Sequence, residues 1–168
     1  MKKSLLGTLA LVVASTACQP PAQEAAGLSE EDVAAITKDV EEGWVGAMKA
    51  GDLATLAAMF TEDAVNMPEN EPAHQGREAI KAWLSAFDDF QFTDLRQTVE
   101  EIAGRDDLAY VRGAFWATVE VEGEPEPIES IGKFIEIRRK QPDGTWLIAV
   151  NIVNSDLPLP EQSAQSEM

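Results

Sequence analysis

The sequence predicts an α+β domain in which N-terminal helices pack on one face of a curved antiparallel sheet. Two observations lead to this prediction. Between residues 29 and 87, apolar residues recur at steps of three and four, the period of an amphipathic helix. After Phe92 the period changes to two, which is typical of half-buried strands, and turns that contain Gly and Pro divide this second half.

Three helices are expected in the first half. The first begins at Ser29, because Ser29 and Asp32 resemble a capping box and acidic residues favour the first turn. Its buried stripe has helical spacing and consists of Val33, Ile36, Val40, Trp44, Ala47 and Met48. Gly51 ends this helix, and Asp52 caps a second, shorter one. The second helix carries Leu53, Leu56 and Phe60, and a third helix after Gly76 carries Ile80, Trp83, Leu84 and Phe87.

Five strands are expected. The first is short, covers residues 64–67 and is closed by Pro68, and a polar loop follows at 69–75. The other four strands form an antiparallel meander at about 93–103, 108–121, 127–139 and 145–154. Residues 159–168 have the composition of a polar C-terminal tail.

The composition limits the possible functions. The chain has 168 residues, of which 45% are hydrophobic and 26% charged, so it is long enough for one globular domain. Its net charge of −17 opposes binding to nucleic acid. With one His and one Cys, the chain cannot build a His- or Cys-rich metal site or an internal disulfide. No cofactor motif is found.

Residues 1–17 have the form of an export signal, with Lys2 and Lys3 ahead of a short apolar stretch that ends in small residues. The segment 14–18, Ala-Ser-Thr-Ala-Cys, resembles the lipobox of bacterial lipoproteins. That resemblance implies cleavage before Cys18 and attachment of lipid to its thiol, so that the protein is held on a membrane. An ordinary secretory signal that happens to contain a Cys is the alternative.

Residues 18–27 have no apolar period and are expected to form a tether between the lipid and the domain. The expected location is therefore the cell envelope. Gln19 is not the Asp that retains lipoproteins at the inner membrane, so a Gram-negative host would place the protein on its outer membrane, facing the periplasm.

Several motifs, taken in order, resemble one family. They are the segments 50–53 (Ala-Gly-Asp-Leu), 60–65 (Phe-Thr-Glu-Asp-Ala-Val), 76–80 (Gly-Arg-Glu-Ala-Ile), 132–134 (Gly-Lys-Phe), 138–146 and 154–158. Over residues 28–158 the chain resembles the SnoaL-like and ketosteroid-isomerase-like branch of the nuclear-transport-factor-2-like superfamily, in particular a bacterial subfamily of unassigned function. The resemblance implies a cone, in which a strongly bent sheet surrounds a long helix and leaves an apolar pocket open at one end. It also implies a homodimer formed through the sheet.

The catalytic residues of ketosteroid isomerase are not found at the matching positions. The Tyr of the first helix corresponds to Trp44, the catalytic base to Pro68 or Met67, and the acid of a late strand to Gly132. Proton abstraction requires a base and a donor to the developing oxyanion. We therefore expect no steroid isomerase activity, and we assign no catalytic residue.

A set of apolar and amide side chains is expected to line the pocket. These candidates are Trp44, Met48, Asn66, Met67, Trp116, Gly132, Phe134 and Asn151. Packing in the core, or hydrogen bonding to the backbone for the two amides, is the alternative for each. His74, in the loop before the third helix, is expected near the pocket mouth, where it could also be merely solvated.

The sequence favours a lipid-anchored module that binds a small hydrophobic molecule. One alternative is a proton-transfer enzyme of the SnoaL-like kind, namely a cyclase, isomerase or hydratase. Another is an envelope scaffold with a vestigial pocket. The expected partners are thus a membrane, through Cys18, a small hydrophobic ligand and a second copy of the chain.

Overall fold

The computed structural model describes residues 27–158, apart from 88–89, 122 and 124. The segments expected to form the signal peptide, the lipidated Cys18 and the C-terminal tail lie outside the described residues, apart from the last tether residue, Gly27. In the part of the chain that the structure describes, no helix is long and apolar enough to cross a membrane.

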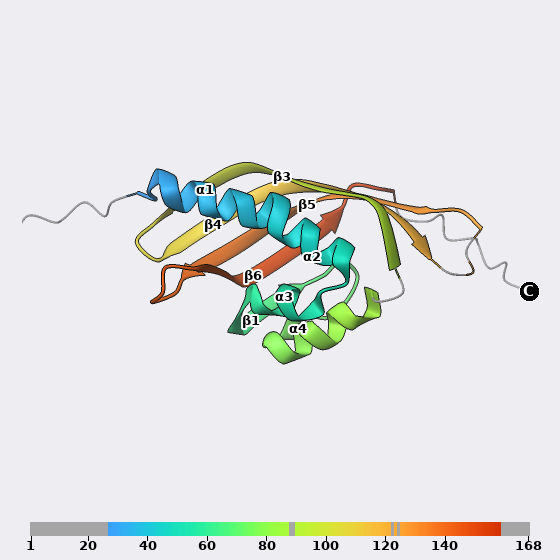
Figure 1. The fold of residues 1–168 in the computed structure, drawn as a ribbon, viewed down its shortest axis with the longest axis horizontal. Helices are drawn as coiled ribbons and strands as arrows, with labels where there is room; N and C mark the ends of the chain where they lie inside the picture. Colours follow the sequence, from blue (N-terminus) through green and yellow to red (C-terminus); the bar gives the residue numbers. More distant parts are fainter. Residues whose placement is uncertain (1–26, 88–89, 122, 124, 159–168) are drawn as a thin grey trace, which may run out of the picture.

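The helices precede most of the sheet, as predicted (Figure 1). The helical elements are α1 (Glu30–Lys38), the π-helical segment η1 (Asp39–Trp44), α2 (Val45–Ala50), α3 (Leu53–Ala58), α4 (Arg77–Leu84) and the 3₁₀ turn η2 (Ser85–Phe87). The strands are β1 (Phe60–Met67), β2 (His74–Gln75), β3 (Phe90–Arg105), β4 (Leu108–Val121), β5 (Ile128–Lys140) and β6 (Trp146–Ser155). The elements α1, η1 and α2 form one continuous helical rod over residues 30–50 (Figure 1).

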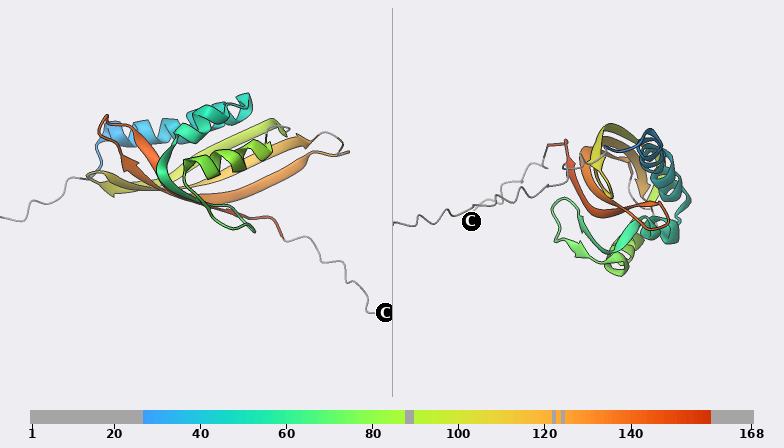
Figure 2. Two further views of the ribbon diagram at one scale, coloured as in Figure 1. Left: turned by 90° about the horizontal axis from the view of Figure 1, so that it is seen from below. Right: turned by 90° about the vertical axis from the view of Figure 1, so that its left-hand side faces the viewer.

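The six strands form one sheet in the order β2-β1-β6-β5-β4-β3. The sheet curves around the helices, so that an end-on view shows strands on one side and helices on the other (Figure 2). This arrangement confirms the α+β cone. The four long strands pair antiparallel, as expected, whereas β1 pairs parallel to β6 and makes the sheet mixed.

The sequence-based boundary between the second helix and the first strand was wrong. Phe60, which was expected on the helix, begins β1, where it pairs with Ile148 and is fully buried. The backbone N–H of Ile148 donates to the carbonyl of Met59. This hydrogen bond to β6 marks the point where the helix ends and the strand begins. His74 and Gln75, expected in a loop, form the edge strand β2. The partner of Phe60 is far away in the sequence, whereas His74 and Gln75 pair with Asn66 and Val65 across the short connection from β1. In both cases strand pairing overrides the local pattern.

Two core clusters hold the helices on the sheet. Under α1 and η1, Ile36 and Val40 pack against residues of the sheet that include Val111, Phe134 and Trp146. Under α3 and α4, the fully buried side chains are Leu56, Phe60, Ala64, Ile80, Leu84 and Ile148. A third group, Leu95, Ala117 and Val119, lies farther along β3 and β4.

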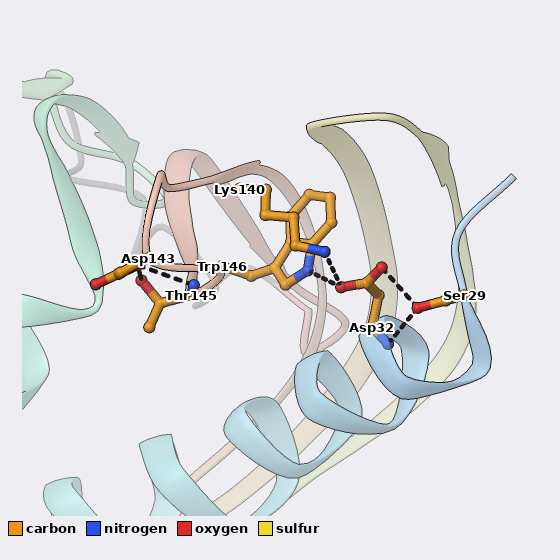
Figure 3. Close-up of polar contacts among 6 residues, drawn as sticks. All are labelled: Ser29, Asp32, Lys140, Asp143, Thr145 and Trp146. Atoms are coloured by element: carbon orange, nitrogen blue, oxygen red, sulfur yellow. Dashed lines mark hydrogen bonds and ion pairs between the residues drawn. The ribbon is translucent and has the colours of Figure 1, made fainter. Parts of the chain in front are cut away.

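The first turn of α1 is attached to the β5–β6 hairpin through Asp32 (Figure 3). Its Oδ1 accepts from Nζ of Lys140 at 2.6 Å and from Nε1 of Trp146 at 2.9 Å. Its Oδ2 accepts from the hydroxyl of Ser29, whose Oγ in turn accepts from the backbone N–H of Asp32 at 3.1 Å. The bond from Lys140, followed by those from Trp146 and Ser29, holds the pKa of Asp32 well below its usual range.

We therefore expect Asp32→Asn to lower the midpoint of urea unfolding at pH 7. A carboxyl whose pKa is lower in the folded state stabilises the fold above its ordinary pKa of 3.8, and this contribution is lost as the pH falls below that value. The difference between the wild type and Asp32→Asn should thus be largest near neutrality and shrink on acidification. Glu31→Gln, at the neighbouring exposed acid, is the control. Equal midpoints for both variants at pH 7 would contradict this role of Asp32.

Candidate functional site

A cavity of about 330 Å³ lies between the concave face of the sheet, the rod and α4. Seven aromatic side chains line it: Trp44, Trp83, Phe87, Phe90, Phe92, Phe115 and Phe134. The other lining residues are Met48, Leu95, Gln97, Ala117, Val119, Ile128, Ser130, Glu136, Asn151 and Val153. An apolar wall with a few polar groups and a volume near 300 Å³ or above is typical of small-molecule sites.

A row of polar residues crosses the concave face at one end of this cavity. In the sheet, Glu136 is paired with Asn151, Asn151 with Asn66, and Asn66 with His74. Residues paired in this way point to the same face, so the four side chains lie next to one another. Glu136 and Asn151 line the cavity, whereas Asn66 lies beside it and is fully buried.

The two amides are bonded to each other. Nδ2 of Asn151 donates to Oδ1 of Asn66 at 2.8 Å. Among the described residues, Nδ2 of Asn66 has no hydrogen-bond partner, although it is buried. Asn151 therefore both lines the cavity and makes a structural hydrogen bond, whereas Asn66 makes only the hydrogen bond.

Arg138 forms ion pairs with Glu136, a member of this row, and with Asp39 of the rod. It is 1% exposed, and its Nε donates to Oε2 of Glu136 at 2.6 Å while its Nη1 donates to Oδ2 of Asp39 at 2.5 Å. Burial alone would lower the pKa of Arg138, but the two facing carboxylates outweigh it and raise the pKa above its ordinary value. One guanidinium thus forms ion pairs with two carboxylates and connects the rod to the sheet.

The η1 segment places its polar and aromatic side chains on this site. Besides Asp39, Glu41 bonds to the sheet, since its Oε1 accepts from the backbone N–H of Val99 at 2.8 Å. Val99 lies at a bulge of β3, where a regular ladder is interrupted. Trp44, the last residue of η1, lines the cavity. The period of the sequence predicted a plain α-helix here, and π-helical turns are frequent at functional sites.

Four of the residues expected in the pocket line the cavity: Trp44, Met48, Phe134 and Asn151. Two others lie on the outer face of the sheet. Trp116 lies under the guanidinium of Arg96, 5.7 Å from its ring centroid, and Met67 is paired with Ile152 at a shallow hollow outside the cavity. Near these two positions apolar residues occur on both faces of the strand, as with Phe115 beside Trp116, so alternation alone did not give the correct face.

Gly132 does not line the cavity because a ring covers it. A Cβ at this position would lie 2.7 Å from the ring of Phe115, which itself lines the cavity. The acid that ketosteroid isomerase carries at the matching position therefore has no space here.

His74 lies behind the cavity wall instead of at its mouth. Its ring is tilted against that of Trp83, with 5.7 Å between the centroids, and Trp83 is the residue that lines the cavity. The indole Nε1 of Trp83 donates to Oε2 of Glu71 at 3.1 Å, and the same oxygen lies 3.5 Å from Nε2 of His74. His74 thus belongs to the packing that positions Trp83.

Glu136, Gln97 and Ser130 also line the cavity, although they were not expected there. A usable signal was present for two of them, because Ser130, Phe134 and Glu136 share one face of β5. Within the described ranges, no group of three or more His, Cys, Asp or Glu residues could hold a metal ion.

The comparisons with known proteins agree with this architecture. A family model described as a SnoaL-like domain matches residues 42–146. No curated protein sequence matches the chain significantly.

Several solved structures share the fold. A ketosteroid isomerase-like protein from Erwinia carotovora atroseptica is 23% identical, with a TM-score of 0.65 over 78% of this chain and 100% of that one. A conserved protein from Planctomyces limnophilus is 24% identical, with a TM-score of 0.68 over 76% and 99%. An NTF2-like protein with a cystatin-like fold from Novosphingobium aromaticivorans is 18% identical, with a TM-score of 0.60 over 80% and 85%.

Removing the buried guanidinium should destabilise the domain strongly. We expect Arg138→Met to lower the free energy of unfolding by about 3–5 kcal/mol, because Glu136 would remain buried without its partner. Arg112→Met removes an arginine that also faces two carboxylates, Glu100 and Glu101, but on the exposed outer face, and should cost far less. Denaturant unfolding of both variants measures the difference, and similar losses would refute the special role of Arg138.

Proposed function

The chain belongs to the SnoaL-like domain family, and we propose that it binds a small, largely apolar molecule in its cavity without ketosteroid isomerase chemistry. The observation that carries this proposal is the cavity itself, with its aromatic wall and a polar group at one end. Its one lining carboxylate, Glu136, is bonded to Arg138. This carboxylate is already engaged in a buried ion pair, which favours binding over proton transfer.

A thermal-shift screen tests this proposal. The full chain with Cys18→Ala, which is free of lipid, would be screened against sterols, quinones, fatty acids and aromatic polyketides. A ligand at one hundred times its dissociation constant should add about 2.7 kcal/mol to the stability. Trp44→Ala and Asn151→Leu, which change the cavity wall, should abolish the shift.

Trp116→Ala is the matched control, because it removes an indole from the outer face. It should leave the ligand-induced shift intact. A shift that survives in both cavity variants would place the ligand elsewhere, and no shift across the panel would contradict a binding function.

We also propose that Cys18 carries lipid and holds the domain on a membrane of the cell envelope, which in a Gram-negative host is the outer membrane facing the periplasm. The support is the sequence at residues 14–18. Cys18→Ala should move the protein from the membrane fraction to the soluble fraction and abolish labelling by radioactive palmitate. Continued membrane association of this variant would argue against the anchor.

The proposed assembly is a homodimer formed through the outer face of the sheet. On this face Tyr110 is paired with Ile137, and Arg112 with Ile135, and the two isoleucines are 39% and 41% exposed. Exposed apolar side chains on a sheet face favour association. Light scattering should give a dimer mass for the Cys18→Ala chain and a monomer mass when Ile135→Glu is added. A monomer mass before that change would overturn this proposal.

A further inference from the structure

The cavity has a polar inner end and an apolar outer end. At the inner end Glu136 and Asn151 lie opposite each other on β5 and β6. At the other end lies Ile128, which precedes Glu136 by eight residues on β5 and is 50% exposed. A strand rises about 3.3 Å per residue, so the two ends are about 26 Å apart along β5. The β4–β5 end of the sheet also extends beyond the helices (Figure 1). A ligand that entered from the exposed Ile128 end would present its leading group to Glu136.

The inner end offers hydrogen-bond acceptors. Asn151 uses Nδ2 to donate to Asn66, which leaves its carbonyl oxygen available as an acceptor. Glu136 accepts from Arg138 through Oε2, and no described residue donates to its Oε1. Acceptors of this kind favour a ligand group that donates several hydrogen bonds.

The inner end also carries an excess of negative charge. The guanidinium of Arg138 is shared between Glu136 and Asp39, so two carboxylates face one cation. Glu136 lines the cavity, whereas Arg138 lies behind it. A cation that reaches Glu136 would compensate the second carboxylate, while an anion would meet a carboxylate with little water to screen it.

Aromatic rings surround the path to this end. Trp44, Phe115 and Phe134 all line the cavity. Phe134 lies two residues before Glu136 on β5, so both side chains are on the same face. The faces of aromatic rings attract cations, and this attraction is stronger where water is excluded. The aromatic wall thus favours a positively charged ligand group, as the inner end does.

We infer that the ligand is an apolar amine, whose ammonium group binds at Glu136 and Asn151 and whose hydrophobic body lies along the aromatic wall. This inference rests on the proposed binding function and adds the chemical class. An ammonium group donates hydrogen bonds to the acceptors of the inner end, and its positive charge compensates the negative charge there. An alcohol supplies one donor and no charge, and a carboxylate supplies neither.

Three probes with one apolar body test this inference: 4-phenylbutylamine, 4-phenylbutanol and 4-phenylbutyrate. Their affinities for the full chain with Cys18→Ala would be measured by calorimetry at pH 7. The amine should bind at least tenfold more tightly than the alcohol, and the acid most weakly. Glu136→Gln should reduce the affinity for the amine at least tenfold and change that for the alcohol less than threefold. Glu129→Gln, at an exposed acid on the same strand, should change neither.

The ranking of the three probes decides the inference even if Glu136→Gln fails to fold. An amine that binds no better than the alcohol, or an acid that binds best, would overturn the inference and leave the binding function standing. If none of the three binds while a neutral molecule of the screening panel does, the result is the same. If no molecule of either set binds, the proposed function fails together with the inference.

Discussion

The domain depends on one buried guanidinium. Arg138 can remain away from water only while Asp39 of the rod and Glu136 of the sheet both accept its hydrogen bonds. A shift of the rod along the sheet would leave a buried charge without its partner, so this ion network fixes where the rod crosses. Trp44 lies at the end of the same π-helical segment as Asp39, and its position over the cavity follows from that crossing. The apolar clusters supply the driving force for folding, but they would tolerate small displacements that the ion network does not.

The aromatic wall and the loss of the isomerase acid have the same structural cause. A Cβ at Gly113 would lie 2.6 Å from the ring of Phe134, and a Cβ at Gly132 would lie 2.7 Å from the ring of Phe115. Each ring lies across the backbone of a neighbouring strand, which is possible only where that strand has no side chain. A side chain at Gly132 would therefore clash with the ring of Phe115 and also with the backbone carbonyl of Asn154, 2.1 Å from such a Cβ.

The sequence predicted the four long strands closely, because alternation and turn residues are local signals. It did not predict the parallel pairing of β1 with β6 or the start of β1 at Phe60, since both depend on contacts between distant segments. The site was predicted only in part. Phe134 and Trp116 lie on different strands, and whether they share a face depends on register, which one sequence does not supply. Glu136 follows from Phe134 by alternation alone, but it is one of 30 acidic residues and was not distinguished from them.

The connection to the proposed anchor lies at the opposite end of the sheet from the opening of the cavity. Gly27, the first described residue, pairs with Arg105 at the end of β3, and the adjacent start of β4 pairs with Arg139 near the end of β5. Ile128, at the outer end of the cavity, begins β5. The ten residues from 18 to 27 span at most about 36 Å when fully extended. With lipid on Cys18, the domain would be attached near the Arg138 end, and its cavity would open away from the attachment point.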